Sequence, residues 1–271
     1  QDTRANMLLI IGDAFGKPLL AAAQTGVFDI SSLRFLYNTG AILSPEVKAG
    51  MLALNPQMQV VDALGSSETG PQAIAMTSAD TADKGTATRF LITKDSAVVS
   101  EDRSHILPKT DMSVGWLART GAVPLGYLGD QARTEATFPV IEGVRYVIGG
   151  DRVHRTEKGS IRLLGRESFT INSGGEKIFA EEVEQAIKQH ADVADVTVVG
   201  RPSPRWGQEV TALVELRPGA DADQTALLQE AARHIARYKL PKAFLFVDQV
   251  QRGASGKTDI QWARALAEDA T

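Results

Sequence analysis

Short apolar runs recur at regular intervals along the first 80 residues, and segments with a helical pattern separate them. The runs are Met7–Ile11, Leu33–Tyr37 and Gln59–Val61 with its neighbours. One predicted helix begins near Pro18 and stops at Gly26. The other has Ser44 as its cap and ends before Pro56. Strand–helix–strand repetition predicts a parallel sheet, with ligands at the carboxyl ends of its strands.

Polar loops follow each of these predicted strands, at Gly12-Asp13, at Thr39-Gly40-Ala41 and at Leu64 through Gly70. The third loop carries Gly65, Ser66, Ser67, Glu68 and Thr69. Its hydroxyls can bond phosphate oxygens, and Glu68 is a hard oxygen ligand suited to Mg²⁺ held with nucleotide phosphates. A polar surface turn is the alternative interpretation, but the place after a parallel strand favours a site.

The pattern changes after residue 80 to short strands and turns without a helical period. The predicted strands are Ala87–Thr93, Ala97–Ser100, Gly115–Arg119, Arg145–Ile148, Val153–Thr156 and Ser160–Leu164, the last two joined by a turn at Glu157-Lys158-Gly159. They indicate a small barrel or antiparallel sheet. Asp151 follows Gly149-Gly150 here, and a carboxylate presented by a glycine turn can accept both ribose hydroxyls. An ordinary turn aspartate is the alternative.

From Gly165 onward the pattern predicts a separate small α+β domain. Its predicted elements are a helix over 180–190, strands over 193–199 and 209–216, a helix over 222–237, a strand over 244–247 and a last helix. Lys257 follows Gly253-Ala254-Ser255-Gly256, a flexible loop that can swing an ammonium toward a phosphate. Arg166 suits a phosphate or ribose, and Gly174-Gly175 allows close backbone approach. The alternatives are a solvated lysine, a surface ion pair and a turn before a helix.

Composition narrows the class of protein. The chain has 271 residues, 43% hydrophobic and 23% charged, which is typical of a globular protein of one large or two ordinary domains. A net charge of −4 argues against nucleic acid as a partner. The lack of cysteine excludes disulfides and thiolate chemistry, and the four histidines include no ligand-spaced pair. No apolar run approaches the ~20 residues that cross a bilayer, and no signal peptide is recognisable, so we expect a cytoplasmic location.

Taken together, the motifs resemble the adenylate-forming superfamily of acyl-CoA synthetases, luciferases and adenylation domains of peptide synthetases. The residues that carry the resemblance are Gly65 to Gly70, Gly126-Tyr127, Thr134 to Phe138, Gly150-Asp151, Gly165-Arg166 through Glu176-Lys177-Ile178, Glu181 to Glu184 and Ser255-Gly256-Lys257. The form Gly-Gly-Glu-Lys, together with Tyr238-Lys239-Leu240-Pro241, looks most like the fatty-acyl-CoA ligase branch.

The resemblance implies two half-reactions, in which ATP and a carboxylate give acyl-AMP and coenzyme A then displaces AMP. It also implies roles for particular residues. Ser67 binds phosphate, Glu68 holds Mg²⁺, Asp62 lies near the adenine amino group, Asp151 binds ribose, Arg166 supports ribose and phosphate, Lys257 serves adenylation, Gly174 and Gly175 approach pantetheine, and Gly40 and Ala41 form a turn between the adenine and acyl pockets. Glu68 and Lys257 would be the catalytic residues, and Gly65 and Ser66 belong to the same nucleotide loop.

Three departures from the family pattern stand out. Leu64 replaces an aromatic ring against adenine, and Ser168 lies near the hinge position usually held by Asp or Lys. The family's glycine-, serine- and threonine-rich phosphate loop is absent, as is about the first half of the large domain. We therefore expect the carboxy-terminal half of an acyl-CoA ligase, inactive alone.

The expected fold is α/β. A partial large domain covers 1–165, with a parallel βα part (1–80) and a β-rich barrel or antiparallel part (81–165), and a small mobile α+β domain covers 166–271. The expected partners are ATP or AMP, a carboxylic acid (a fatty acid first) and coenzyme A, and the chain allows peripheral membrane contact. The alternatives are a ligase that loads an acyl carrier protein, a ligase for aryl or sterol-derived acids, and a non-catalytic nucleotide-binding module.

Overall fold

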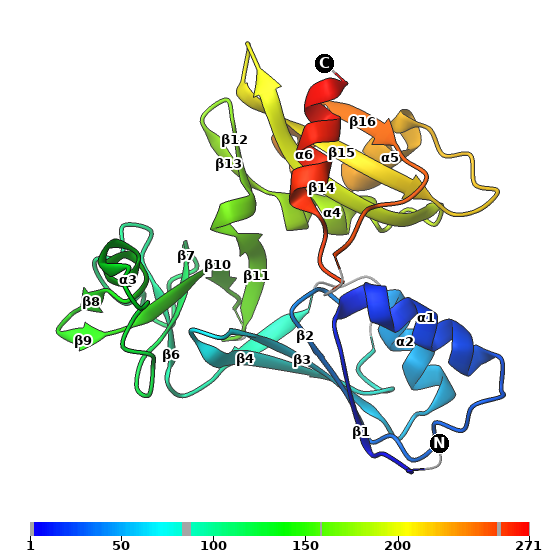
Figure 1. The fold of residues 1–271 in the computed structure, drawn as a ribbon, viewed down its shortest axis with the longest axis horizontal. Coiled ribbons are helices and arrows are strands. Elements are labelled where there is room, and N and C mark those ends of the chain that lie inside the picture. Colours follow the sequence, from blue (N-terminus) through cyan, green and yellow to red (C-terminus); the bar gives the residue numbers. More distant parts are fainter. Residues whose placement is uncertain (1–2, 83–87, 158, 254–255, 271) are drawn as a thin grey trace. The chain divides into compact units, whose positions relative to one another are not determined.

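A computed structural model describes residues 3–82, 88–157, 159–253 and 256–270. Parts of three predictions lie outside these ranges, namely Ala87 of a strand, Lys158 of a turn, and Ala254 and Ser255 of the glycine loop. The chain divides into two compact units, which are described separately (Figure 1). Unit 1 comprises residues 1–163 with 255–257, and unit 2 comprises residues 164–254 with 258–271.

Unit 1 begins with the predicted parallel strands and their helices. These are β1 (Met7–Ile10), α1 (Gly12–Gln24), β2 (Phe35–Thr39), α2 (Pro45–Leu54) and β3 (Gln59–Ser66). Strand β2 pairs in parallel with both β1 and β3. Buried side chains from the strands, such as Leu36 and Val60, form one core with Val47 and Met51 of α2. Leu19 and Leu20 of α1 pack against the same core, so both helices cover one face of the parallel strands.

The two helices start for different reasons. Helix α2 begins as predicted, because the Ser44 side chain accepts a hydrogen bond from the Val47 N–H and Pro45 occupies the first turn. The prediction that the first helix begins near Pro18 is wrong, since α1 begins at Gly12 and Pro18 lies inside it. The Asn38 side chain accepts the Gly12 N–H at 2.7 Å and so satisfies an N–H at the helix start. The predicted loop Gly12-Asp13 is therefore the first turn of α1.

The β-rich part continues the same sheet. Its strands are β4 (Gly70–Thr77), β5 (Arg89–Ile92), β6 (Ser96–Val99), β7 (Val114–Arg119), β10 (Val147–Arg155) and β11 (Ile161–Arg166). Among the described residues the strands follow the order β1-β2-β3-β4-β5-β11-β10-β7-β6. Strand β4 pairs antiparallel with β3 and β5, β11 with β5, and β7 with β6 and β10, in agreement with the predicted change of pattern.

The sequence pattern did not predict one short helix in this part. Helix α3 (Gln131–Thr137) begins at Asp130, whose side chain accepts the Arg133 N–H at 3.0 Å. A two-stranded ribbon of β8 (Val140–Ile141) and β9 (Val144–Arg145) follows it. With seven residues and none of them buried, α3 has no apolar stripe that could reveal it.

The face of the β1–β5 region opposite the two helices is apolar and open. Strand pairing places Met7 beside Phe35, and Leu9 in one row with Met76 through Tyr37 and Val61. Met7, Leu9, Phe35, Met76 and Leu91 are 56, 60, 41, 56 and 63% exposed. In the described part of the chain, no helix covers these side chains. We call this surface the open face.

Unit 2 is a mixed sheet with helices on both faces. Its strands are β12 (Thr170–Ser173), β13 (Glu176–Phe179), β14 (Val193–Ser203), β15 (Gly207–Leu216) and β16 (Ala243–Phe246). Its helices are α4 (Ala180–Ile187), α5 (Gln224–Ala231) and α6 (Ile260–Asp269), with 3₁₀ turns at Glu167–Phe169 and Arg237–Lys239.

Alternation along the two long strands of unit 2 separates its two cores. Val196 and Val198 of β14 join the core under α4 and α5. Val199 and Leu213 pack with α6 through Ala263. The predicted helix over 222–237 is shorter than expected, because α5 ends at Ala231.

No helix within the described ranges is long and apolar enough to cross a membrane.

Candidate active site

The turn between β3 and β4 holds its shape through its own side chains. The Ser66 N–H donates to the Thr69 hydroxyl at 2.9 Å, and the Thr69 N–H donates to the Ser66 hydroxyl at 3.3 Å. A Cβ on Gly65 would lie 2.3 Å from the Gly70 carbonyl oxygen, and Gly70 has a φ of +59°. Arg119 of β7 donates to the Thr69 carbonyl at 2.8 Å. Both glycines are therefore required by this turn, at the carboxyl end of the parallel strand β3.

Glu68 is the carboxylate that this turn presents. Its Oε2 accepts the Ser66 hydroxyl at 2.8 Å, and its Oε1 accepts the Tyr127 hydroxyl at 2.9 Å. These two hydrogen bonds, with a smaller contribution from Arg133, lower the pKa of Glu68 below its ordinary value. The Arg133 guanidinium lies 3.9 Å from the centre of the Tyr127 ring. Glu68 is thus held ionised beside Ser67, which is exposed.

The β10 backbone two residues before Asp151 lies against this turn. A Cβ on Gly149 would lie 3.1 Å from Thr69 Cγ2 and 3.7 Å from Ser66 Oγ. The pairing of β10 with β7 shifts register between Ile148 and Arg152, and Gly150 within this bulge has a φ of +95°. The bulge therefore brings the Asp151 segment against the Ser66–Thr69 turn, so unit 1 holds both predicted carboxylates in one region.

The residue after Asp151 anchors the bulge. Arg152 has a side chain that is 1% exposed, forms an ion pair with Glu101, and lies 4.0 Å from the centre of the Trp116 ring. The Trp116 indole N–H donates to the Glu101 carbonyl at 3.0 Å. A cation this deeply buried needs such partners, so the residue next to Asp151 is held by buried contacts.

Asn38 connects the carboxyl ends of the parallel strands. Its Nδ2 donates to the Ala41 carbonyl at 3.1 Å and to Asp62 Oδ1 at 2.8 Å, while its Oδ1 accepts the Gly12 N–H. Asp62 also forms an ion pair with Lys48 at 2.6 Å. Gly40, with a φ of +79°, makes the turn possible. The structure thus places Asp62 in a buried polar network beneath the Gly40-Ala41 turn.

Leu64 is half-buried and packs against the cluster that includes Ala73 and Phe90. Its predicted contact with adenine stays a prediction.

Lys257 groups with unit 1. Gly256 is buried, has a φ of +73°, and a Cβ there would lie 3.1 Å from Ala14 Cβ. Lys257 is exposed, and its Cε would lie 3.9 Å from a Cβ on Gly40. The lysine therefore reaches the carboxyl end of β2, beside the predicted Gly40-Ala41 turn.

The remaining predicted residues belong to unit 2. Arg166 ends β11 and its N–H donates to Glu181 Oε1 at 3.2 Å. Gly174 and Gly175, with φ of +60° and +88°, form a two-residue hairpin turn between β12 and β13. Four residues of β13 separate this turn from α4, so the alternative interpretation as a turn before a helix also agrees with the structure. The Gly174 N–H donates to the Trp206 carbonyl at 2.9 Å, and the Trp206 ring lies over Gly174.

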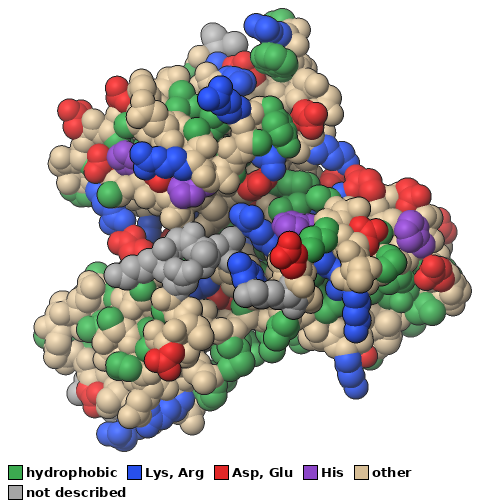
Figure 2. All heavy atoms as spheres, turned by 180° about the vertical axis from the view of Figure 1, so that it is seen from behind, with side chains coloured by type: hydrophobic (Ala, Val, Ile, Leu, Met, Phe, Trp, Pro, Cys, Tyr) green, Lys and Arg blue, Asp and Glu red, His purple; other side chains and the backbone are tan. Residues whose placement is uncertain are grey.

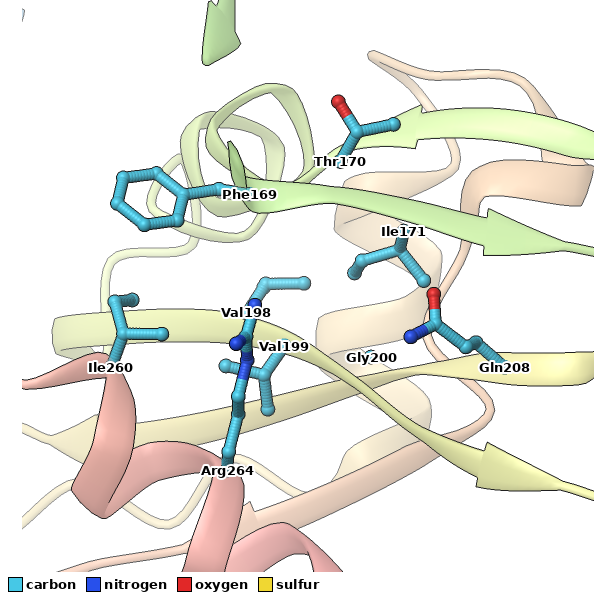
Figure 3. Close-up of a pocket in the computed structure, with 9 residues that line it drawn as sticks. All are labelled: Phe169, Thr170, Ile171, Val198, Val199, Gly200, Gln208, Ile260 and Arg264. Carbon is cyan, nitrogen blue, oxygen red and sulfur yellow. The ribbon is translucent and has the colours of Figure 1, made fainter. Parts of the chain in front are cut away.

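The pocket in Figure 3 lies within unit 2 and includes none of the predicted site residues. Thr170, Val198, Gln208 and Arg264 are among the residues that line it, and they come from strands of the sheet and from α6. Figure 2 shows cationic and anionic side chains interspersed on the face it presents. The prediction that the chain does not bind nucleic acid continues to rest on the net charge of −4.

Sequence reasoning missed several residues that support the site. Tyr127 belonged to a quoted motif but had no role, although its hydroxyl holds Glu68. Asn38 and Lys48 are polar residues on otherwise apolar elements, and that signal could have indicated a buried network. Arg119 carries no local signal, because its contact with Thr69 spans 50 residues.

Comparison with known proteins identifies the family. Residues 182–257 match the model of the AMP-binding enzyme C-terminal domain. The chain is 51% identical over 261 residues to the medium-chain acyl-CoA ligase Mig of Mycobacterium avium, covering 96% of this chain and 47% of that protein. It is 41% identical over 266 residues to the medium/long-chain-fatty-acid–CoA/3-oxocholest-4-en-26-oate–CoA ligase of Mycobacterium tuberculosis (strain CDC 1551 / Oshkosh), covering 98% and 48%.

Solved structures show the same fold. The amide bond synthetase McbA from Marinactinospora thermotolerans superposes with a TM-score of 0.83 at 23% identity, over 99% of this chain and 53% of that one. The chain thus spans about half the length of the curated relatives it matches. The predicted α/β fold class and the predicted family are both confirmed. Residues 182–257 thus match the AMP-binding enzyme C-terminal domain, and nearly the whole chain is homologous to medium- and long-chain acyl-CoA ligases over about half of their length.

Proposed function

We propose that the chain forms the part of an acyl-CoA ligase that closes on the nucleotide and carries the thioester step. The carboxylate oxygen of a fatty acid attacks the α-phosphorus of ATP, and the bond to pyrophosphate breaks to give acyl-AMP. The thiol of coenzyme A then attacks the acyl carbon, loses its proton, and releases AMP. The named activities of the homologous ligases support a medium- or long-chain acid as the substrate class.

One observation carries this proposal. The Ser66–Thr69 turn, with the ionised Glu68, lies against the β10 bulge that presents Asp151. A hydroxyl-rich turn suits phosphate oxygens, and a nearby carboxylate suits ribose hydroxyls. We assign Ser67 to phosphate, Asp151 to ribose, and Asp62 and Leu64 to the adenine side. Arg166 of unit 2 is assigned to ribose and phosphate, and the hairpin turn at Gly174-Gly175 to pantetheine.

The donor atoms of Glu68 fit a magnesium ion. Each carboxylate oxygen accepts one hydrogen bond and retains a lone pair, and the lowered pKa keeps the group ionised. Among the described residues no group of three or more His, Asp or Glu side chains could hold a metal. A single carboxylate together with substrate phosphates is a usual way to bind Mg²⁺. When bound, the ion would neutralise phosphate charge.

Lys257 is assigned the complementary role. Its side chain is exposed and reaches the carboxyl end of β2, beside Gly40. A cation at this edge would stabilise the charge that develops as pyrophosphate leaves. We expect its loss to slow adenylation far more than thioester formation.

ATP–pyrophosphate exchange tests the proposal. We would join this chain to the part of the Mycobacterium avium ligase that it does not match, and compare the hybrid with the chain alone. We expect exchange in the hybrid with medium-chain acids and none in the chain alone. Lys257→Ala should reduce exchange by about a hundredfold or more, as loss of a transition-state contact does. Lys109→Ala, which removes another exposed lysine of unit 1, should not.

Two alternatives differ in measurable ways. A sterol-derived acid is favoured by the name of the Mycobacterium tuberculosis relative, so the panel of acids should include a steroid side-chain acid. Coenzyme A and a phosphopantetheine carrier protein should be compared as acceptors. Robust exchange by the isolated chain, or a folded hybrid that binds acyl-AMP analogues without turnover, would contradict the proposed activity. A cytoplasmic location stays a prediction.

A further inference from the structure

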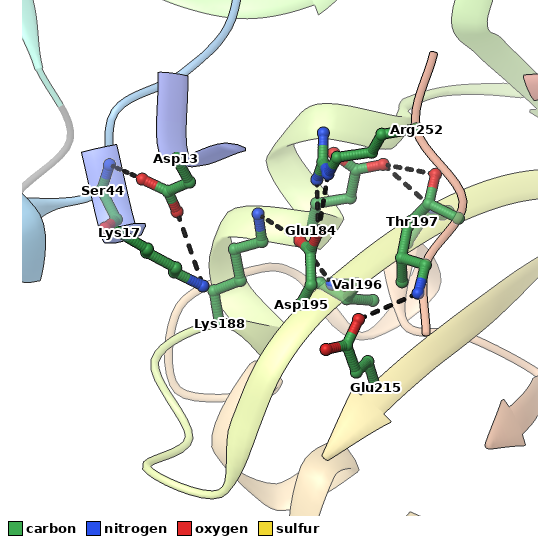
Figure 4. Close-up of polar contacts among 12 residues, drawn as sticks. Asp13, Lys17, Ser44, Glu184, Lys188, Asp195, Val196, Thr197, Glu215 and Arg252 are labelled. Atoms are coloured by element: carbon green, nitrogen blue, oxygen red, sulfur yellow. Dashed lines mark hydrogen bonds and ion pairs between the residues drawn. The ribbon is translucent and has the colours of Figure 1, made fainter. Parts of the chain in front are cut away.

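Two carboxylates of unit 2 bind the segment that precedes Lys257, at residues 250–252. Asp195 of β14 and Glu215 of β15 are opposite each other in the antiparallel pairing. Glu215 Oε2 accepts the Val250 N–H at 2.9 Å. Asp195 Oδ2 accepts the Arg252 Nε and Nη2 at 2.9 and 2.5 Å (Figure 4). Val250 and Arg252 are thus both fixed to β14 and β15, the two longest strands of the unit.

Asp195 is a strong anchor because several donors converge on it. Its other oxygen, Oδ1, lies 2.9 Å from the Lys188 ammonium and accepts the Val196 N–H at 2.9 Å. Burial alone would raise the pKa of Asp195, but Lys188 and Arg252 outweigh it and lower the pKa below the ordinary value. The Asp195 and Arg252 side chains are only 14 and 22% exposed, so solvent weakens their attraction less than at a surface pair.

The anchor sits at the base of a closed loop. Arg252 and Thr258 form an antiparallel bridge, and the Asp259 N–H donates to the Gln251 carbonyl at 2.9 Å. The chain therefore leaves and returns at the same place, with residues 253–257 between. Asp259 also accepts the Trp262 N–H at 3.0 Å and so begins α6. The segment that enters the loop at this base, residues 250–252, is held by side-chain contacts with β14 and β15.

Gly253 and Gly256 lie between this base and Lys257, and glycine restricts its own backbone less than any other residue. The position of Lys257, five residues beyond Arg252, depends on how firmly the base is held. A displacement of about 1 Å in a reacting group can slow a reaction about a hundredfold. Resting on the role proposed above for Lys257, we propose that Asp195 and Arg252 are positioning residues, whose ion pair fixes the base of the Lys257 loop for adenylation.

Neighbouring charges do not substitute for this pair. Glu184 of α4 uses its Oε1 for the Val198 N–H and the Thr197 hydroxyl, at 2.9 and 3.3 Å. Burial raises the pKa of Glu184, which limits its use as a second anion for Arg252. Lys188 approaches Asp195 through the other oxygen.

Hydrogen exchange of the 271-residue chain tests the anchor directly. Arg252→Gln and Asp195→Asn each remove a charge-assisted hydrogen bond, so amide exchange over 251–259 should accelerate by about tenfold or more. Arg252→Lys keeps the charge and should retain part of the protection. The matched control is Arg201→Gln, which breaks the 2.7 Å pair with Glu209 on the same two strands. Unchanged exchange in the Arg252 and Asp195 variants, or equal acceleration in the Arg201 control, would overturn the inference.

The hybrid ligase supplies the functional readout. Arg252→Gln should lower kcat for ATP–pyrophosphate exchange by about tenfold, with little change in KM for ATP, and should spare thioester formation from supplied acyl-AMP. In a Lys257→Ala background the same change should have no further effect. Equal loss in both half-reactions, or a full loss in that background, would overturn the positioning role. A Lys257→Ala variant with normal exchange would instead contradict the proposed role of Lys257, while hydrogen exchange would still measure the anchor.

Discussion

The buried pair of Lys48 and Asp62 makes a quantitative prediction for Lys48→Met. The two side chains are 7 and 6% exposed and their charged atoms lie 2.6 Å apart. Methionine keeps most of the volume but removes the charge, which leaves the Asp62 carboxylate with the Asn38 amide as a donor. Removal of one partner from a buried ion pair costs about 3–5 kcal/mol. We therefore expect unit 1 to lose about this much stability.

Native-state hydrogen exchange is the suitable measurement, because the two units need not unfold together. Amides of β2 and β3 should exchange at least about a hundredfold faster in Lys48→Met, since 1.4 kcal/mol corresponds to a factor of ten. Lys17→Met is the matched control. Lys17 is 36% exposed and lies 3.9 Å from Asp13, so its loss should cost less than about 1 kcal/mol.

A second variant separates charge from packing. Lys48→Met with Asp62→Asn removes both charges, and it should be more stable than Lys48→Met alone because no unpaired anion remains buried. If Lys48→Met accelerates exchange no more than Lys17→Met, the reasoning is refuted and Asp62 does not depend on a buried cation.

Two further outcomes follow from the geometry of unit 2. Gly174→Ala should destabilise this unit by about 1–3 kcal/mol, and more than Gly175→Ala does. Both changes strain a positive φ, but only the Cβ added at Gly174 meets the Trp206 ring, at 2.8 Å. Chemical denaturation measures both variants, and equal effects would contradict the contact. The lowered pKa of Asp195 means that its contribution to stability is present above the unfolded carboxyl pKa and is lost as pH falls through the folded value. Between about pH 5 and 2, the stability of unit 2 should therefore fall less steeply in Asp195→Asn than in the unchanged chain, as followed by Trp206 and Trp262 fluorescence, and parallel profiles would count against the pair.

The sequence predicted elements wherever the evidence was local. Ser44 and Pro45 identified the start of α2 within one residue, and the glycines around Glu68 and before Asp151 identified two turns that the structure contains. Each of these signals acts within a few residues, through a cap, a ring constraint or a positive φ. The strand positions followed from apolar runs for the same reason.

Most of the wrong or missed predictions concern boundaries and contacts that residues distant in the sequence determine. Helix α1 begins six residues before Pro18 because Asn38, 26 residues away, accepts the Gly12 N–H. The end of α5 is a local exception, because the apolar pattern continues past Ala231 while the His234 N–H bonds the Ala231 carbonyl three residues back. Tyr127 contacts Glu68 across 59 residues. A pattern read along the chain contains no information on such pairs.

The open face of β1–β5 has a practical consequence for anyone who prepares this polypeptide. Met7, Leu9, Phe35, Met76 and Leu91 expose apolar area along paired strands, and β1 lies at the sheet border with an unpaired edge among the described strands. A contiguous exposed apolar surface beside an unpaired strand edge promotes aggregation. The 271-residue chain should therefore increase the fluorescence of anilinonaphthalene dyes, and its solutions should become turbid on concentration. A solubility screen should begin with lysine substitutions at Met7 and Leu9.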